Sequence, residues 1–376
     1  MIYFDNAATT MHKPEAVIDA VTEAMTSFGG PGRGSHKAAL DASMAVFDAR
    51  QALASLLDAP AAKNVSFALN ATMALNIAIE GVLADGAAAL TTAASHNSVL
   101  RPLARARDER GCDMRIAPIL PDGSLDWGRY EALLDGTSLV AVTHASNVTG
   151  DVYDVARMCE MAHSQGALFI LDAAQTAGAL PLSFSDLGAD ILCFTGHKSL
   201  YGPQGTGGLV VADGVEVRPL LEGGSGVHSY DERHPRFMPE ALEAGTANAH
   251  GLAGLAAGVK HLSSIGVKNV RDKVAQLADR LRLGASAIPG VKMYGCAVND
   301  RCGIVALNLG DMDSGAVSDI LFSRFGICTR PGAHCAPLMH RALGTQQQGV
   351  VRFSFGWNNT ADEVDRALEA LEAIAR

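Results

Sequence analysis

The sequence predicts an α/β protein built around a mostly parallel β-sheet. Seven short apolar stretches recur through the first two-thirds of the chain, and the segments between them are long enough to form the helices that connect parallel strands. The last third instead carries long helical patterns of apolar residues. We therefore expect a large domain with a mostly parallel seven-stranded sheet and a smaller α+β C-terminal domain.

Each predicted strand is a short run of apolar residues without the alternation of a half-exposed strand. The seven strands are expected at 65–69, 87–93, 114–119, 138–143, 167–172, 190–195 and 207–212. Such runs are typical of a parallel sheet that is covered by helices on both faces.

The first helix is expected to begin at Pro14, because proline suits the first turn of a helix. Val17, Ile18, Val21 and Met25 follow it at helical spacing. We expect these four side chains to form the apolar stripe of that helix.

The other predicted elements lie in the last third of the chain and in one long loop. A helix is predicted over 267–283 and a strand over 303–309. Thr360 and Glu363 have the spacing of a capping box, which predicts the start of the last helix. The segment 223–248, rich in glycine, serine, histidine and proline, is predicted to be a long loop of functional importance.

A change of pattern near 255–265 predicts a domain boundary. We expect the large domain to span 15–255. The small domain should combine 256–376 with residues 1–14, which are expected to pack against the C-terminal part.

Composition and charge exclude several classes of function. With 48% hydrophobic and 19% charged residues, the chain can bury a sizeable core. A net charge of −10 without a basic block argues against a nucleic-acid partner. No apolar run approaches the roughly 18 residues of a membrane span, and the first residues do not resemble a secretion signal. The seven cysteines lack CxxC spacing, so we expect no disulfide framework, no metal site and a cytoplasmic setting.

Several of the predicted strands are followed directly by a polar residue of a catalytic type. Because the carboxyl ends of parallel strands meet at one crevice, residues far apart in sequence are expected to converge there. The candidates are Ala71 and Thr72 at the start of a helix, His96, Asn147, Asp172 with Gln175, and Thr195 with His197 and Lys198.

These residue types suit the chemistry of pyridoxal phosphate (PLP). The amine of Lys198 can form a Schiff base with the aldehyde of the cofactor. A buried carboxylate, Asp172, keeps the pyridine nitrogen protonated, so that the ring withdraws electrons. His96 can stack on the ring and carry protons, and Gln175 and Asn147 can hydrogen-bond the phenolic oxygen. Backbone N–H groups and hydroxyls suit the phosphate, and the candidates are Ala71, Thr72, Thr195 and His197.

Four segments carry a resemblance to a known family. LDAAQTAG and TGHKSLYGPQGTG, with YFDNAATT at the start and HCAP late in the chain, resemble segments of the class V aminotransferases. Within that family the chain is most similar to cysteine desulfurases and selenocysteine lyases, which are PLP enzymes of fold type I. The resemblance implies a homodimer with a shared active site, in which Thr246 reaches the phosphate of the neighbouring subunit. Arg33 and His36 match a substrate-binding segment at the edge of the site.

The resemblance also assigns the substrate end of the site. Arg352 matches the arginine that holds the substrate α-carboxylate, with Asn147 beside it; the planar guanidinium can grip a carboxylate with two parallel hydrogen bonds. Cys335 matches the nucleophile of the desulfurases, and Pro331 and Pro337 place it on an irregular loop.

The surroundings of Cys335 bear on its reactivity. We expect His334 and Arg330 to favour the thiolate, which is the reactive form of cysteine. Relatives commonly have threonine and histidine where this chain has Pro331 and Ala333, so this loop departs from the family pattern.

The hypothesis that follows is a PLP-dependent cysteine desulfurase. Lys198 removes the Cα proton of cysteine, and the Cys335 thiolate takes the substrate sulfur, leaving alanine and a persulfide whose sulfur passes to an acceptor protein. The alternatives are a selenocysteine lyase, an aminotransferase or lyase that does not use Cys335, and a catalytically silent dimeric scaffold. Taken singly, Lys198 would be a solvated loop lysine and Cys335 a small buried hydrophobe; the joint spacing favours PLP.

Overall fold

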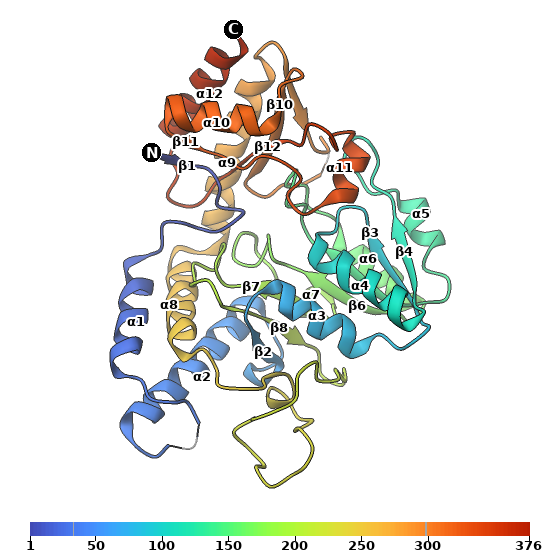
Figure 1. Ribbon diagram of the computed structural model, residues 1–376, viewed down its shortest axis with the longest axis vertical. Coiled ribbons are helices and arrows are strands. Elements are labelled where there is room, and N and C mark those ends of the chain that lie inside the picture. Colours follow the sequence, from blue (N-terminus) through green and yellow to red (C-terminus); the bar gives the residue numbers. More distant parts are fainter. Residues whose placement is uncertain (33, 298) are drawn as a thin grey trace.

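The computed structural model describes residues 1–32, 34–297 and 299–376, and it has the predicted α/β architecture (Figure 1). Its largest sheet has seven strands in the order β2-β8-β7-β6-β5-β3-β4. Strand β8 runs antiparallel to both β2 and β7, and the other neighbours are parallel. The mostly parallel sheet is therefore confirmed.

All seven predicted strands are present, each within about two residues of the expected ends. They are β2 (Val65–Ala68), β3 (Ala88–Thr92), β4 (Asp113–Ala117), β5 (Thr137–Thr143), β6 (Leu168–Asp172), β7 (Ile191–Thr195) and β8 (Gly207–Val211). The helices are α1 (Glu15–Ser27), α2 (Lys37–Leu57), α3 (Ala71–Val82), α4 (Asn97–Arg110), α5 (Trp127–Ala132), α6 (Val155–Ser164), α7 (Phe184–Leu187), α8 (Ala249–Ile265), α9 (Val267–Ser286), α10 (Ser314–Phe325), α11 (Pro337–Leu343) and α12 (Ala361–Ala375).

The sheet is buried on both faces, which explains why its strands read as continuous apolar runs. Leu139 and Ala141 of β5 face a core formed with α3 and α4. The alternate residues, Val140 and Val142, face a second core formed with α6.

A second, antiparallel sheet lies in the C-terminal part, in the order β12-β10-β9. Strand β10 (Ile304–Leu309) is the one predicted; β9 (Val291–Tyr294) and β12 (Val351–Ser354) are short and were not predicted from the sequence. The N-terminal strand β1 (Ile2–Tyr3) pairs in parallel with β11 (Ile327–Cys328). Figure 1 shows both chain termini at this end of the molecule.

The structure confirms two of the helix predictions and contradicts part of a third. Helix α9 covers the predicted segment, and both hydrogen bonds of the Thr360–Glu363 capping box are present at the start of α12. The predicted stripe of α1 is wrong in part. Val17 is buried, but Ile18 and Met25 are 57% and 68% exposed, because α1 packs on α8 through a narrower face.

The long loop is irregular apart from a 3₁₀ turn, η2 (Glu240–Leu242). The domain boundary expected between residues 255 and 256 falls inside α8, and it stays a prediction. Over the described residues, no helix combines the length and the apolar character needed to cross a membrane.

His144 ties together the carboxyl ends of β5 and β6, where the candidate residues gather. Its N–H donates to the carbonyl of Asp172 (3.0 Å), and its own carbonyl accepts from the N–H of Tyr153 (2.9 Å). The buried imidazole forms a hydrogen bond through Nδ1 with the hydroxyl of Thr176 (3.0 Å). Burial lowers the pKa of His144 from 6.5 to about 4, so the ring stays neutral in the folded protein down to that pH.

We predict that His144 makes the protein acid-sensitive. Between pH 6.5 and about 4 the unfolded chain binds a proton at this residue that the folded chain does not bind, so the free energy of unfolding falls as the pH is lowered through this window. In His144→Gln, the free energy of unfolding should fall by about 3 kcal/mol less over this pH window than in the wild type, as measured by urea unfolding of the apoprotein. The control is His12→Gln at an exposed histidine. An unchanged pH dependence in His144→Gln would contradict this assignment.

Candidate active site

A cavity of about 310 Å³ lies at the carboxyl ends of the parallel strands. Its walls come from the turns after several strands, from the N-termini of α3 and α4, and from the loop before α11. Eleven residues predicted from the sequence line it: Ala71, Thr72, His96, Asn147, Asp172, Gln175, Thr195, His197, Lys198, Cys335 and Arg352.

Asp172 is the last residue of β6, and Lys198 lies three residues after the end of the adjacent strand β7. The Asp172 side chain is 4% exposed, and the N–H of Ala174 donates to its Oδ1 (3.0 Å). Burial raises the pKa of Asp172, while the Ala174 N–H and Lys198 oppose that shift. Burial likewise lowers the pKa of Lys198 to about 8, and Asp172 opposes the decrease. The pair therefore combines a reactive amine with a carboxylate that lacks a full counter-charge.

The glycine between Thr195 and His197 is required by close packing. A Cβ atom on Gly196 would lie 2.1 Å from Oγ1 of Thr206, which is too close for any side chain. The N–H of Gly196 also donates to the carbonyl of Thr206 (2.8 Å). This close contact fixes the turn that carries Lys198 into the cavity.

One end of the cavity has the features of a phosphate site. Within the described residues, Oγ1 of Thr195 and Nδ1 of His197 are buried and have no hydrogen-bond partner. Ala71 and Thr72 begin helix α3, whose first N–H groups have no partner within the helix. Burial lowers the pKa of His197 to about 4. These orphaned polar atoms fit the phosphate of the predicted cofactor.

His96 is both the N-cap of α4 and part of the cavity wall. Its Nδ1 accepts a hydrogen bond from the N–H of Ser98 (3.0 Å), which fixes the ring. Burial and the nearby Lys198 lower the pKa of His96 to about 4. A neutral imidazole can stack on an aromatic ring and can accept a proton.

The two amides expected near the phenolic oxygen are both engaged within the protein. Nε2 of Gln175 donates to the carbonyl of Ala7 (3.3 Å). Nδ2 of Asn147 donates to the carbonyl of His334 (2.6 Å), which ties the loop of Cys335 to the sheet. Their roles toward cofactor and substrate stay predictions.

Arg352 is 2% exposed and enters the cavity from β12. Its two terminal nitrogens donate to the carbonyl of Asn147 (2.8 Å) and to Oδ1 of Asp5 (2.9 Å). Nε is buried and has no partner within the described part of the chain. Burial lowers the pKa of Arg352, and Asp5 opposes that shift. The guanidinium therefore keeps free N–H groups for a carboxylate ligand.

Cys335 is the exposed member of the seven cysteines; Cys328 is partly exposed and the other five are buried. His334 and Cys335 both have positive φ angles, 50° and 56°. Such backbone strain persists only where the surroundings hold it. The carbonyl of Cys335 accepts from the N–H of Asn97 (2.8 Å), so the loop is tied to the start of α4.

The expectation that His334 favours a Cys335 thiolate through positive charge is wrong. Burial and the nearby Arg352 lower the pKa of His334 to about 3, so the ring is neutral at physiological pH. Its Nε2 is hydrogen-bonded to the carbonyl of Arg330 (3.0 Å), and its ring stacks on that of His340. His334 therefore stabilises the loop, and the cationic side chains that line the cavity with Cys335 are Lys198, Arg330 and Arg352.

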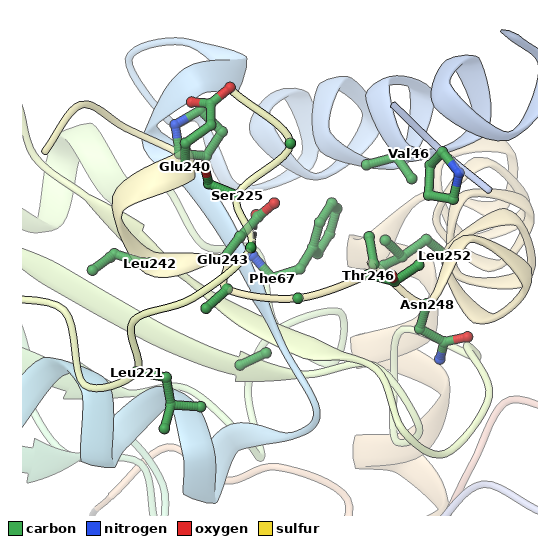
Figure 2. A pocket seen from close by; sticks show the side chains of 18 of the residues that line it. Val46, Phe67, Leu221, Ser225, Glu240, Leu242, Glu243, Thr246, Asn248 and Leu252 are labelled. Atoms are coloured by element: carbon green, nitrogen blue, oxygen red, sulfur yellow. Dashed lines mark hydrogen bonds between the residues drawn. The ribbon is translucent and has the colours of Figure 1, made fainter. Parts of the chain in front are cut away.

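Two predicted residues lie outside this cavity in the single chain, Thr246 and His36. Thr246 lines a separate hollow of about 710 Å³, where Figure 2 shows it with Phe67 and Glu243. His36 is exposed and caps α2 by accepting from the N–H of Ala39 (3.3 Å). Arg33 lies outside the described residues.

The segment carrying Thr246 is anchored by a partly buried ion pair. Glu243 accepts hydrogen bonds from both terminal nitrogens of Arg50 (2.6 and 2.9 Å) and from the N–H of Phe67 (2.7 Å). The guanidinium of Arg50 also lies over the ring of Phe67, 4.6 Å from its centre. Thr246 is thus presented on a well-anchored edge of the hollow.

Sequence reasoning missed the part played by the N-terminal segment. Thr9, Thr10 and Lys13 all donate to the carbonyl of His197, and the hydroxyl of Thr10 donates to the carbonyl of Lys198 (2.9 Å). Asp5 pairs with Arg352. These partners are separated by more than 180 residues, so no local pattern in the sequence could pair them.

Comparisons with known proteins agree with this geometry. A probable cysteine desulfurase of Methanothermobacter thermautotrophicus is 35% identical over 100% of this chain and 94% of its own length. A cysteine desulfurase of Haloferax volcanii is 31% identical over 99% of this chain and 89% of its own length.

The chain is also similar in structure to solved cysteine desulfurases. The apo structure of a cysteine desulfurase from Thermococcus onnurineus has a TM-score of 0.94 at 31% identity, covering 100% of this chain and 94% of that one. For a cysteine desulfurase from Escherichia coli the TM-score is 0.89 at 29% identity, with coverage of 99% and 94%. The predicted fold type I architecture is confirmed. Residues 2–367 match the class-V aminotransferases, and the chain belongs to that family.

Proposed function

We propose that this protein is a PLP-dependent cysteine desulfurase. The observation that carries the proposal is one cavity lined by Lys198, Asp172, Arg352 and the exposed Cys335. The names of the full-length relatives support the same activity. Three of these residues suit any amino-acid-transforming PLP enzyme, whereas the exposed thiol favours a sulfur-transferring one.

The residues fit the cofactor group by group. Lys198 would hold the cofactor covalently through its amine. The protonated pyridine nitrogen of the cofactor would supply the positive charge that the buried carboxylate of Asp172 lacks. His96 would cover the ring, with Gln175 and Asn147 near the phenolic oxygen. Its phosphate would be bound by the unpartnered polar atoms at the other end, from Ala71, Thr72, Thr195 and His197.

When bound, PLP withdraws electrons from the Cα atom of an amino acid joined to it. The protein supplies the rest. The free edge of Arg352 holds the α-carboxylate. The amine of Lys198, whose pKa is about 8, takes the proton from Cα and can return it. His96, neutral above about pH 4, is a second proton carrier in the same cavity.

The sulfur step is a transfer between two thiols. The Cys335 sulfur attacks the sulfur of the substrate cysteine, the substrate Cβ–S bond breaks, and Cβ receives a proton. The products are alanine and a persulfide on Cys335. A thiol of an acceptor then takes the outer sulfur and restores the Cys335 thiol.

We predict that borohydride fixes PLP to Lys198 and leaves Lys13 unmodified. Burial lowers the pKa of Lys13 to about 8 as well, so it serves as an internal comparison of equal basicity. Lys198 should be selected because it lines the cavity and lies near Asp172, whereas Lys13 donates to the carbonyl of His197. Peptide mass mapping identifies the modified lysine. A protein that takes up no PLP, or is modified at Lys13, would overturn the assignment.

We predict that Cys335→Ser keeps the visible absorption of the bound cofactor but lowers sulfide release from cysteine by at least about a hundredfold. The reason is loss of the sulfur nucleophile without change to the cofactor site. Cys328→Ser, at a partly exposed cysteine, is the control and should keep the wild-type rate. Full sulfide release by Cys335→Ser would refute the persulfide step. Amino transfer to a keto acid would favour an aminotransferase, and a preference for selenocysteine would favour a lyase.

We propose further that the active protein is a homodimer in which Thr246 of each chain contacts the phosphate in the other. Leu40, Met44 and Phe47 lie on one face of α2 and are each about half exposed. Helix α2 and two more exposed apolar residues, Leu220 and Leu221, border the hollow that holds Thr246. Apolar surface of this kind is typical of an interface.

We predict a dimer of the 39.1 kDa chain in analytical ultracentrifugation. Phe47→Asp should yield monomers that retain PLP poorly, because a buried charge opposes association and each site loses its neighbour's Thr246. Phe322→Asp, at a phenylalanine of α10 that is 55% exposed, is the matched control and should stay dimeric. A monomeric wild-type protein with full PLP occupancy would exclude the shared site.

A further inference from the structure

Asp5 belongs to the N-terminal segment and lies behind the cavity wall, where its side chain contacts Arg352. It forms a parallel bridge with Ser354 of β12, and Tyr3 donates through its hydroxyl to the carbonyl of Asp5 (3.2 Å). The side chain of Asp5 is 19% exposed. The backbone on both sides is therefore held, and the carboxylate has a defined position.

This carboxylate lies between two arginines of the cavity wall. Its Oδ1 is 2.9 Å from a terminal nitrogen of Arg352, and its Oδ2 is 3.9 Å from one of Arg330. Arg330 and Arg352 are antiparallel neighbours whose backbones exchange two hydrogen bonds (3.1 and 2.9 Å). Directly opposed residues of such a pair share one face, so both guanidinium groups emerge on the same side.

The hydrogen bonds of Arg352 determine which N–H groups of its guanidinium remain free for a ligand. A guanidinium has five N–H groups. One terminal nitrogen donates to Asn147 and the other to Asp5, while Nε is buried without a partner in the described residues. Nε–H and a remaining N–H of the nitrogen bound to Asp5 form one edge, which is the fork that binds a carboxylate with two hydrogen bonds. The bond to Asp5 fixes the rotation of that fork.

The charges at this end of the cavity nearly balance. In the same cavity Lys198 and Asp172 offset each other. Of the remaining groups, Arg330 and Arg352 carry two positive charges, and Asp5 carries one negative charge. One positive charge remains, which matches a single α-carboxylate. A substrate with a second acidic group would place that group in an electrostatically neutral region, where its lost hydration is not compensated.

We propose that Asp5 is a positioning and specificity-determining residue: it orients Arg352 for the substrate α-carboxylate and restricts the site to amino acids with one acidic group. The inference rests on the proposed function, because the ligand is the amino-acid substrate. It favours cysteine over dicarboxylic amino acids and over cysteine sulfinate, whose side chain adds a negative charge.

The test is ligand binding to the holoenzyme, followed by the visible absorption of the cofactor. L-Alanine is the probe with one carboxylate, and L-aspartate is the probe with two. In Asp5→Asn the dissociation constant of alanine should rise about tenfold, because the fork is no longer fixed. That of aspartate should stay level or fall, because the net charge rises from one to two. The preference for alanine should thus drop at least about tenfold.

Two further variants separate charge from structure. Asp5→Asn/Arg330→Gln restores a net charge of one, so the preference for alanine should return while alanine binding stays weak. Asp19→Asn, at an exposed carboxylate of α1, should change neither constant. Should Asp5→Asn not fold, Arg330→Gln alone lowers the net charge to zero and should raise the preference for alanine.

The outcomes distinguish this inference from the proposed function. A holoenzyme that releases sulfide from cysteine, but whose Asp5→Asn variant weakens alanine and aspartate by the same factor, would overturn the role of Asp5 alone. A double variant that does not recover the preference would overturn the charge argument. Failure to bind PLP at all would instead overturn the proposed function.

Discussion

A buried carboxylate close to a buried amine is the constraint on which the rest of this site depends. Asp172 ends β6 and Lys198 follows β7, and each opposes the pKa shift that burial causes in the other. Each side chain therefore reduces the cost that burial imposes on the charge of the other. The parallel pairing of β6 with β7 brings them together. The position of Lys198 also requires the tight turn at Gly196, which has no room for a side chain.

The N-terminal segment holds this arrangement from the other side. Three donors from Thr9, Thr10 and Lys13 meet at the carbonyl of His197, directly before Lys198. A few residues earlier, Asp5 binds Arg352. One short segment thus fixes both the lysine of the large sheet and the arginine of the small sheet. This double attachment explains why the N-terminal strand is paired within the C-terminal part, far from the helix that follows it.

The loop of Cys335 and the hollow lined by Thr246 differ in their relation to the cavity. Cys335 is held on a strained loop by Asn97, while Asn147 binds the adjacent carbonyl of His334. This anchoring would give the proposed nucleophile a fixed approach to a substrate bound beside it. Thr246, by contrast, follows the segment that the Arg50–Glu243 pair anchors, and it lies apart from the cavity of its own chain. The single chain therefore brings Cys335 and Arg352 together in one cavity, whereas Thr246 lines a separate hollow.

The sequence by itself determined the seven strands of the large sheet and eleven of the residues that line the cavity. Strands buried on both faces need continuous apolar runs, and polar residues after such runs gather at one edge of a parallel sheet, which accounts for nine of the eleven. Cys335 and Arg352 were predicted from the family resemblance instead. Only the tertiary structure decided the hydrogen-bond partners of Asp5 and Lys13, the neutral state of His334, and the separate place of Thr246. Each of these depends on burial or on a partner remote in the chain, and neither quantity is carried by local composition or spacing.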